Sequence, residues 1–229
     1  MASASAPSEH DKQALCVDIL VSGHVQAFVD FFYLTHRPEA AGAAAPSGEG
    51  APPAEDHLNL PAAKLPYIQG KLADAEVARR EGNTQAVFAA YMQLANLFGD
   101  EIGDHRTAVY FWEKCAEIAR QTGDAMWEMA ATKALGVAHE ALGDVKLAIS
   151  FYEKLQRLTS DARTKTGEKE AWVHLYKANV VLAEAATAAG ELQGALALRK
   201  TCLQAAMSAG DTPMLGKAHY ETGQVCIYC

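Results

Sequence analysis

The stretch GDHRTAVYFWEKC at residues 103–115 returns forty positions later as GDVKLAISFYEKL at residues 143–155. Glycine, aspartate, alanine, an aromatic residue, glutamate and lysine hold the same places in both copies. A fixed period of this length is typical of solenoids, in which each helix pair buries its apolar face only against its neighbours. The repeat therefore predicts an all-α solenoid of helix-turn-helix pairs with a period of about forty residues.

Glycines followed by Asp, Asn or another polar residue punctuate the chain from residue 82 onward. Glycine accepts the left-handed conformation that ends a helix, and the next side chain can accept hydrogen bonds from the first N–H groups of the following helix. The spacing predicts helices over residues 64–80, 84–99, 105–121, 125–142, 145–159, 168–189, 192–208 and 212–229.

A third copy of the repeat is displaced by forty-seven residues, so that Gly190 matches Gly143. Arg199 stands where the two earlier copies carry an aromatic residue. Seven extra residues must precede this copy, and the polar composition of residues 161–169 predicts that they form a turn there.

Composition divides the chain into three parts. Residues 1–36 are expected to form short N-terminal helices, and residues 37–57 lack large apolar side chains and are expected to be a flexible Ala/Pro/Gly linker. Residues 58–229 are predicted to be the solenoid. Its last repeat is incomplete, because the partner of Ala195 would fall beyond the last residue, so we expect a longer parent sequence or a partner that completes the stack.

Charge and cysteine content restrict the function classes. The formal net charge is −8, with 28 acidic against 20 basic residues, which is unlike a nucleic-acid-binding surface. The N-terminus lacks the apolar core of a signal peptide, and no apolar run is long enough to span a membrane, so a soluble cytoplasmic protein is expected. The five cysteines are expected to be reduced structural thiols.

A search for chemistry finds no catalytic motif and no cofactor fingerprint, and no metal site is expected from the eight histidines. Cys226 and Cys229 form a lone Cys-x-x-Cys pair that also resembles a prenylation box; we interpret it as the end of an apolar helix. No catalytic, cofactor or metal residues are predicted.

Small residues and one large residue recur at fixed places in the second copy: Gly136, Gly143, Ala148 and Tyr152. This pattern resembles tetratricopeptide-repeat proteins, whose paired helices approach closely at small residues and whose first helices line a concave partner-binding groove. The resemblance implies a candidate groove formed by Gln93, Leu97, Lys133, Val137, Glu140, Lys177, Val180, Glu184, Lys217, Tyr220 and Gln224. Members that grip a terminal carboxylate need an amide or a base where this chain has Leu97, Val137 and Glu184, so that role is not expected.

Four further segments, LCVDIL (15–20), GHVQAF (23–28), LADAEVARR (72–80) and GKAHY (216–220), resemble tetratricopeptide-repeat proteins of motile cilia and sperm flagella. The resemblance implies a non-catalytic scaffold of the cytoskeleton, located in the axoneme and supporting its assembly and beating. It also implies dynein-associated or intraflagellar-transport partners. The alternative is a soluble cytosolic adaptor in intraflagellar transport or in a signalling or cochaperone-like complex.

Overall fold

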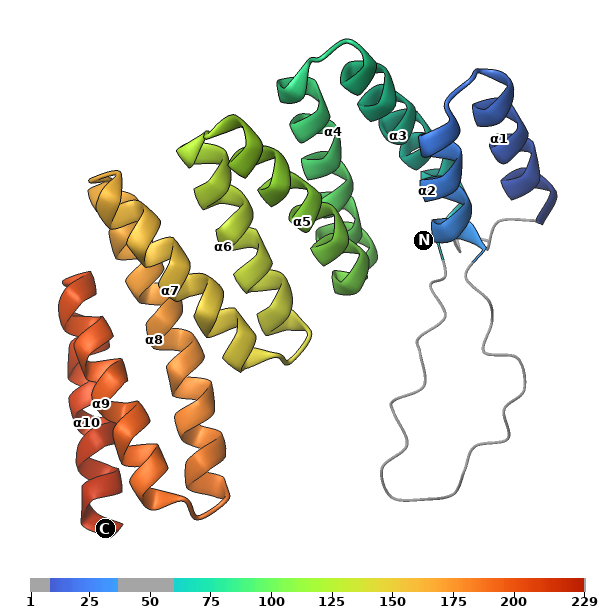
Figure 1. The fold of residues 1–229 in the computed structure, drawn as a ribbon. Helices are drawn as coiled ribbons and strands as arrows, with labels where there is room; N and C mark the ends of the chain where they lie inside the picture. The colour runs from blue at the N-terminus through green and yellow to red at the C-terminus, as the bar shows by residue number, and fades with distance from the viewer. Residues whose placement is uncertain (1–8, 37–59, 229) are drawn as a thin grey trace, which may run out of the picture. The chain divides into compact units, whose positions relative to one another are not determined.

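The computed structural model describes residues 9–36 and 60–228, and these form helices joined by short turns (Figure 1). The part of the chain that is described contains no β-strand. Contacts divide the chain into two compact units, residues 1–104 and 105–229. The predicted all-α architecture of stacked helix pairs is confirmed. The predicted linker at residues 37–57 lies outside the described residues and stays a prediction.

The described residues of unit 1 form four α-helices: α1 (Glu9–Val21), α2 (Val25–Thr35), α3 (Leu65–Arg80) and α4 (Thr84–Asn96). A short 3-10 turn, Ala62–Lys64, leads into α3, and a π-helical turn, Leu97–Ile102, continues α4. Helix α3 packs against α1, α2 and α4. The N-terminal helices therefore join the helical stack of unit 1 through α3.

A buried carboxylate fixes α2 to α3. Glu76 Oε2 accepts a hydrogen bond from the backbone N–H of Ala27, in the first turn of α2, at 2.9 Å. Arg80, one turn along α3, forms an ion pair with Glu76 and donates to the Gly23 carbonyl at 2.5 Å. Burial of Glu76 opposes its charged form, but the Ala27 N–H and the Arg80 charge outweigh this, so the pKa of the carboxyl is lowered. The carboxylate thus stabilises the positive end of the α2 dipole.

Unit 2 consists of six helices, each packed against the next along the chain. Figure 1 shows them running up and down side by side in chain order. Their bounds match the prediction closely, except at α8: α5 (His105–Thr122), α6 (Ala125–Ala141), α7 (Val145–Asp161), α8 (Lys165–Ala188), α9 (Leu192–Ala209) and α10 (Thr212–Tyr228).

Left-handed glycines end the helices, as the sequence indicates. Gly143, between α6 and α7, has φ +84° with nothing within 4 Å of a built Cβ, so its conformation alone requires glycine. After Gly123, the Asp124 carboxylate accepts hydrogen bonds from Met126 and Trp127 N–H at 2.9 and 3.0 Å. The same left-handed conformation occurs at Gly23, Gly82, Gly103, Gly123, Gly143, Gly190 and Gly210.

The seven extra residues lie in a helix: the turn predicted at residues 161–169 covers only residues 162–164, and its extension to residue 169 is wrong. Arg163, with φ 52°, takes the left-handed place between α7 and α8, forty residues after Gly123. Helix α8 starts at once, at Lys165, and has 24 residues where α6 has 17. An insertion of seven residues is close to two helical turns, so the later residues of α8 keep the face that they would have had without it.

Helices α6 and α7 approach closely at Gly136. A Cβ built on Gly136 would lie 2.8 Å from Tyr152 Cδ1 and 3.0 Å from Cζ, and closer still to Cε1. Tyr152 is fully buried and joins a core of small and aromatic side chains from α7 to α10. The glycine therefore makes room for the tyrosine ring.

Candidate functional site

Nine of the eleven residues of the candidate groove lie in unit 2, on alternate helices. Helix α6 carries Lys133, Val137 and Glu140; α8 carries Lys177, Val180 and Glu184; α10 carries Lys217, Tyr220 and Gln224. An ion pair of 2.8 Å between Lys133 of α6 and Glu170 of α8 shows that these two helices adjoin on one face. We refer to the nine residues as the unit 2 groove.

Most charges of the unit 2 groove have partners. Besides the Lys133 pair, Lys217 Nζ lies 3.6 Å from Glu221, and Glu140 accepts a hydrogen bond from the Tyr152 hydroxyl at 2.7 Å. Lys177 and Glu184, seven residues apart on α8, are exposed and form no ion pair with any described residue. A partner can therefore form an ion pair with Lys177 or Glu184 without first breaking an ion pair within the chain.

The apolar and amide members of the groove differ in exposure. Val137 is 46 % exposed and Tyr220 is 66 % exposed, whereas Val180 is half-buried and packs on the core. The Gln224 amide donates to the Tyr220 hydroxyl at 2.8 Å. Val137 and Tyr220 thus remain available as apolar contacts.

The two remaining predicted residues lie in unit 1. Gln93 of α4 accepts a long hydrogen bond of 3.4 Å from the Tyr67 hydroxyl. Leu97 is only 3 % exposed, so its side chain offers almost no surface to a partner. Leu97 is therefore removed from the candidate groove.

Tyr152 of α7 is buried beneath the unit 2 groove, between α6 and α8. Its ring stacks on His174 of α8 with centroids 4.7 Å apart, and its hydroxyl bonds Glu140 of α6. Burial, together with Glu140, raises the pKa of the tyrosine hydroxyl, and burial lowers the pKa of the His174 imidazole. Both rings are thus neutral at neutral pH and fill the space between the helices.

In the next repeat, the positions that correspond to Tyr152 and His174 carry charged residues. Arg199 takes the place of Tyr152, and Glu221 takes the place of His174, at the same offset of forty-seven. Arg199 is 7 % exposed, and its Nη1 donates to Glu221 Oε2 at 2.5 Å. Its Nε is buried without a hydrogen-bond partner. The neutral aromatic ring of Tyr152 is thus replaced by the charged side chain of Arg199.

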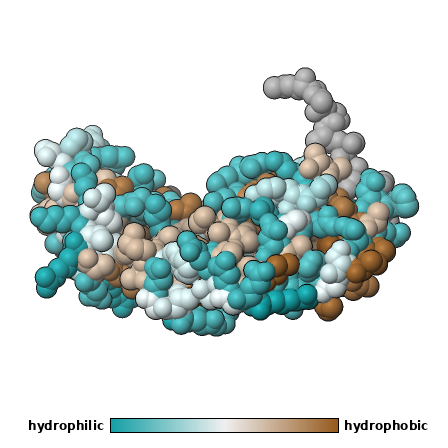
Figure 2. Space-filling model, turned by 90° about the horizontal axis from the view of Figure 1, so that it is seen from above, coloured by the Kyte–Doolittle hydropathy of each residue, from teal (hydrophilic) through white to brown (hydrophobic). Residues whose placement is uncertain are grey.

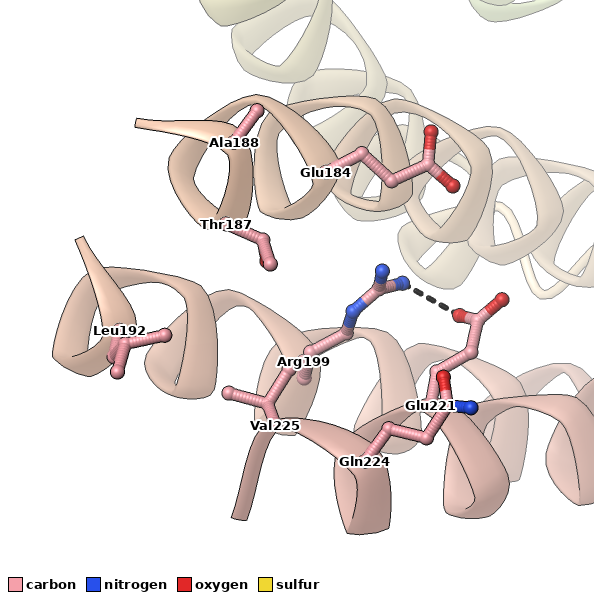
Figure 3. A pocket seen from close by; sticks show the side chains of 8 residues that line it. All are labelled: Glu184, Thr187, Ala188, Leu192, Arg199, Glu221, Gln224 and Val225. Atoms are coloured by element: carbon pink, nitrogen blue, oxygen red, sulfur yellow. Dashed lines mark hydrogen bonds and ion pairs between the residues drawn. The ribbon is translucent and has the colours of Figure 1, made fainter. Parts of the chain in front are cut away.

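A cavity of about 340 Å³ lies beside Arg199, between α8, α9 and α10. Figure 3 shows the Arg199 guanidinium at its centre, joined to Glu221 on one side and facing Glu184 across the opening. The lining residues are Glu184, Thr187, Ala188, Leu192, Arg199, Glu221, Gln224 and Val225. Sequence reasoning placed only Glu184 and Gln224 here. The replacement of an aromatic by Arg199 was the signal that could have located the rest.

The thiols of the described residues differ in burial. Burial raises the pKa of Cys115 to about 12 and that of Cys202 to about 11. Cys226 is exposed, and Cys229 lies outside the described residues. No three His, Cys, Asp or Glu side chains of residues 9–36 and 60–228 gather as metal ligands would. None of the described helices has the length and apolarity needed to cross a bilayer.

Comparison with known proteins agrees with the repeat pattern. No protein-family profile matches the chain. A mouse (Mus musculus) protein is 26 % identical over 223 residues, which cover 93 % of this chain and 46 % of the mouse protein, and it is named tetratricopeptide repeat protein 29. This chain is similar to tetratricopeptide repeat protein 29. The protein of that name from Trypanosoma brucei brucei is 28 % identical over 155 residues, 67 % of this chain and 30 % of its own length.

The rat (Rattus norvegicus) tetratricopeptide repeat protein 29 is likewise 26 % identical over 225 residues. The chain thus spans between about a third and a half of the length of these relatives. The resemblance predicted from the sequence is confirmed. Similarity to tetratricopeptide repeat protein 29 indicates a protein-interaction scaffold.

Proposed function

We propose that this chain is a non-catalytic scaffold of the motile cilium or flagellum, which holds dynein-associated components during axoneme assembly and supports beating. The observation that carries the proposal is the unit 2 groove, with unpaired charges at Lys177 and Glu184, in a chain similar to tetratricopeptide repeat protein 29. Alternating charges and apolar spots on the alternate helices α6, α8 and α10 suit a peptide or helix as ligand.

A cochaperone-like role is disfavoured by the residues themselves. Gripping a terminal carboxylate requires bases or amides that converge on it. Val137 is apolar and exposed, and Glu184 is an unpaired acid, so both would oppose an incoming carboxylate. A soluble adaptor of intraflagellar transport stays the alternative to a component built into the axoneme.

A second surface supports a scaffold with more than one partner. Helices α1 and α2 expose Val17 (60 %), Val21 (83 %) and Tyr33 (71 %), together with Leu20, Val25 and Phe32. Figure 2 shows hydrophobic side chains gathered at the right of the view, where these N-terminal helices lie in Figure 1. Large apolar patches on a protein surface mark interaction sites.

Cell fractionation separates the two alternatives. An axonemal scaffold stays with detergent-extracted microtubule doublets and is released only by high salt, whereas a soluble adaptor appears in the detergent wash. Recovery of all the protein in the wash would contradict an axonemal role.

Charge reversal tests the groove itself. Lys177→Glu should reduce co-purification of the partner, because the groove then repels the acidic group that the lysine attracts. Lys146→Glu, which makes the same change at an exposed site on α7, is the matched control. Equal recovery with both variants would contradict binding in the groove.

A further inference from the structure

We propose that the cavity between α8, α9 and α10 binds a lysine or arginine side chain of a partner protein. The inference rests on the proposed function, since the cavity opens on the unit 2 groove, and it specifies the chemistry of the partner. Four observations carry it: a change in the repeat, an unpaired carboxylate, a buried donor and an aliphatic wall.

The cavity lies beside a paired change in the repeat. In the preceding repeat Gly136 admits the ring of Tyr152, which packs between its helices. Forty-seven residues later the corresponding pair is Ala183 and Arg199, both buried. Arg199 lines the cavity, so this repeat places a charged side chain where the preceding one has a neutral ring.

The charges of the cavity favour a cation. Two carboxylates, Glu184 and Glu221, line it with one guanidinium, that of Arg199. Arg199 is already paired with Glu221, which also lies 3.6 Å from Lys217, while Glu184 forms no ion pair in the described part of the chain. In Figure 3 the Glu184 carboxylate stands across from the Arg199–Glu221 pair. A bound ammonium or guanidinium gives Glu184 its missing partner, since the charge of Arg199 is already balanced by Glu221.

The buried Nε of Arg199 lacks an acceptor. An unsatisfied buried donor is costly, and the Arg199 Nε–H has no acceptor in the structure. A main-chain carbonyl oxygen of the bound segment satisfies it without adding negative charge. The remaining wall, Ala188, Leu192 and Val225, is aliphatic and suits the methylene stem of a basic side chain.

The test uses capped single residues as probes of the full chain. The N-acetyl, N-methylamide derivatives of lysine, arginine, norleucine and glutamate each present main-chain carbonyls but differ in charge. Binding is followed by NMR through the methyl groups of Leu192 and Val225, labelled with ¹³C. Lysine and arginine probes should shift both methyl signals with dissociation constants on the order of millimolar, as expected for such small ligands. Norleucine should bind more weakly, and glutamate should leave the signals unchanged.

Two variants and one control define the outcome. Glu184→Gln should weaken the lysine probe about three- to tenfold, because a partly exposed charge partner is lost. Glu191→Gln removes the same charge from an exposed residue outside the lining and should have no effect. The double variant Ala183→Gly with Arg199→Tyr restores the pair of the preceding repeat, fills the cavity and should abolish binding of every probe.

Three results would overturn the inference: stronger shifts with glutamate than with lysine, no shift with any probe, or equal weakening by Glu184→Gln and Glu191→Gln. Failure here is distinct from failure of the proposed function. If the basic probes do not bind but Lys177→Glu still loses the partner, the groove binds a protein and only the chemistry assigned to the cavity is wrong.

Discussion

Adding one methyl group at Gly136 should destabilise unit 2 measurably. The new Cβ would lie 2.8 Å from Tyr152 Cδ1 and 3.0 Å from Cζ, where ordinary contacts are 3.4–4 Å. The ring cannot retreat, because it is fully buried, stacks on His174 at 4.7 Å and bonds Glu140 at 2.7 Å. Gly136→Ala must therefore push α6 away from α7 or displace the ring.

The expected size follows from two opposing terms. Overpacking a well-filled core costs about 1–3 kcal/mol, and the fixed ring places this site in the upper part of that range. Alanine in place of glycine inside a helix returns about 1 kcal/mol. The free energy of unfolding should therefore fall by about 1–2 kcal/mol. Without the clash the same substitution would raise it.

Urea unfolding followed by circular dichroism at 222 nm measures the change. Gly223→Ala is the matched control, because Gly223 takes the same repeat position in α10 but has nothing within 4 Å of its Cβ. The control should gain up to about 1 kcal/mol. Adding Tyr152→Leu to Gly136→Ala should recover part of the loss in a double-mutant cycle. A Gly136→Ala protein as stable as the wild type would refute the reasoning.

Two further predictions concern buried titratable groups. Glu76→Gln should lower the free energy of unfolding by about 1–3 kcal/mol at pH 7, since a charged acceptor for a buried N–H is lost, while Glu81→Gln at an exposed site should not. The pKa of Glu76 in the folded protein lies below its usual 4.5, so the carboxylate's contribution to the free energy of unfolding is present above pH 4.5. That contribution is lost as the pH falls through the pKa of the folded state. Urea unfolding at pH 7 and at pH 3 checks both statements. In thiol labelling at pH 8 mapped by mass spectrometry, exposed Cys226 should react within minutes while Cys115, with a pKa raised to about 12 by burial, stays protected until the protein unfolds. Equal labelling rates would contradict the packing of α5.

The parts of the fold that repeat could be predicted from the sequence. Gly143 and its equivalents indicate helix ends in the sequence, because glycine adopts the left-handed conformation found there more easily than other residues do. The recurrence of Ala148 and Tyr152 indicates where paired helices touch. These features are local, so a single chain reveals them.

The misplaced insertion has a physical cause. The first turns of α8, from Lys165 to Glu170, are mostly exposed and polar, so they show no apolar periodicity. Gly167 reinforced the prediction of a turn. In the structure it is helical, and its Cβ would lie 2.9 Å from Thr159 Cγ2, so it marks a close approach of two helices. A glycine that ends a helix and one that admits a neighbour look alike in sequence.

The candidate site was only partly predictable. Family positions located Lys177 and Glu184 but not which charges would lack partners, since a pair such as Lys133 with Glu170 joins two helices and depends on how they pack. The cavity is lined by residues of three helices, with Arg199 among them. Such a space becomes visible only when the helices are placed together.

Crosslinking mass spectrometry on intact, detergent-extracted axonemes tests the central claim, that the alternate helices of unit 2 bind another protein. Lys177 on α8 and Lys217 on α10 belong to the groove, whereas the exposed Lys146 on α7 and Lys200 on α9 belong to the intervening helices. We predict crosslinks to an axonemal protein from Lys177 and Lys217, and few from Lys146 and Lys200. Crosslinks to other proteins that arise from Lys146 and Lys200 alone would contradict the claim.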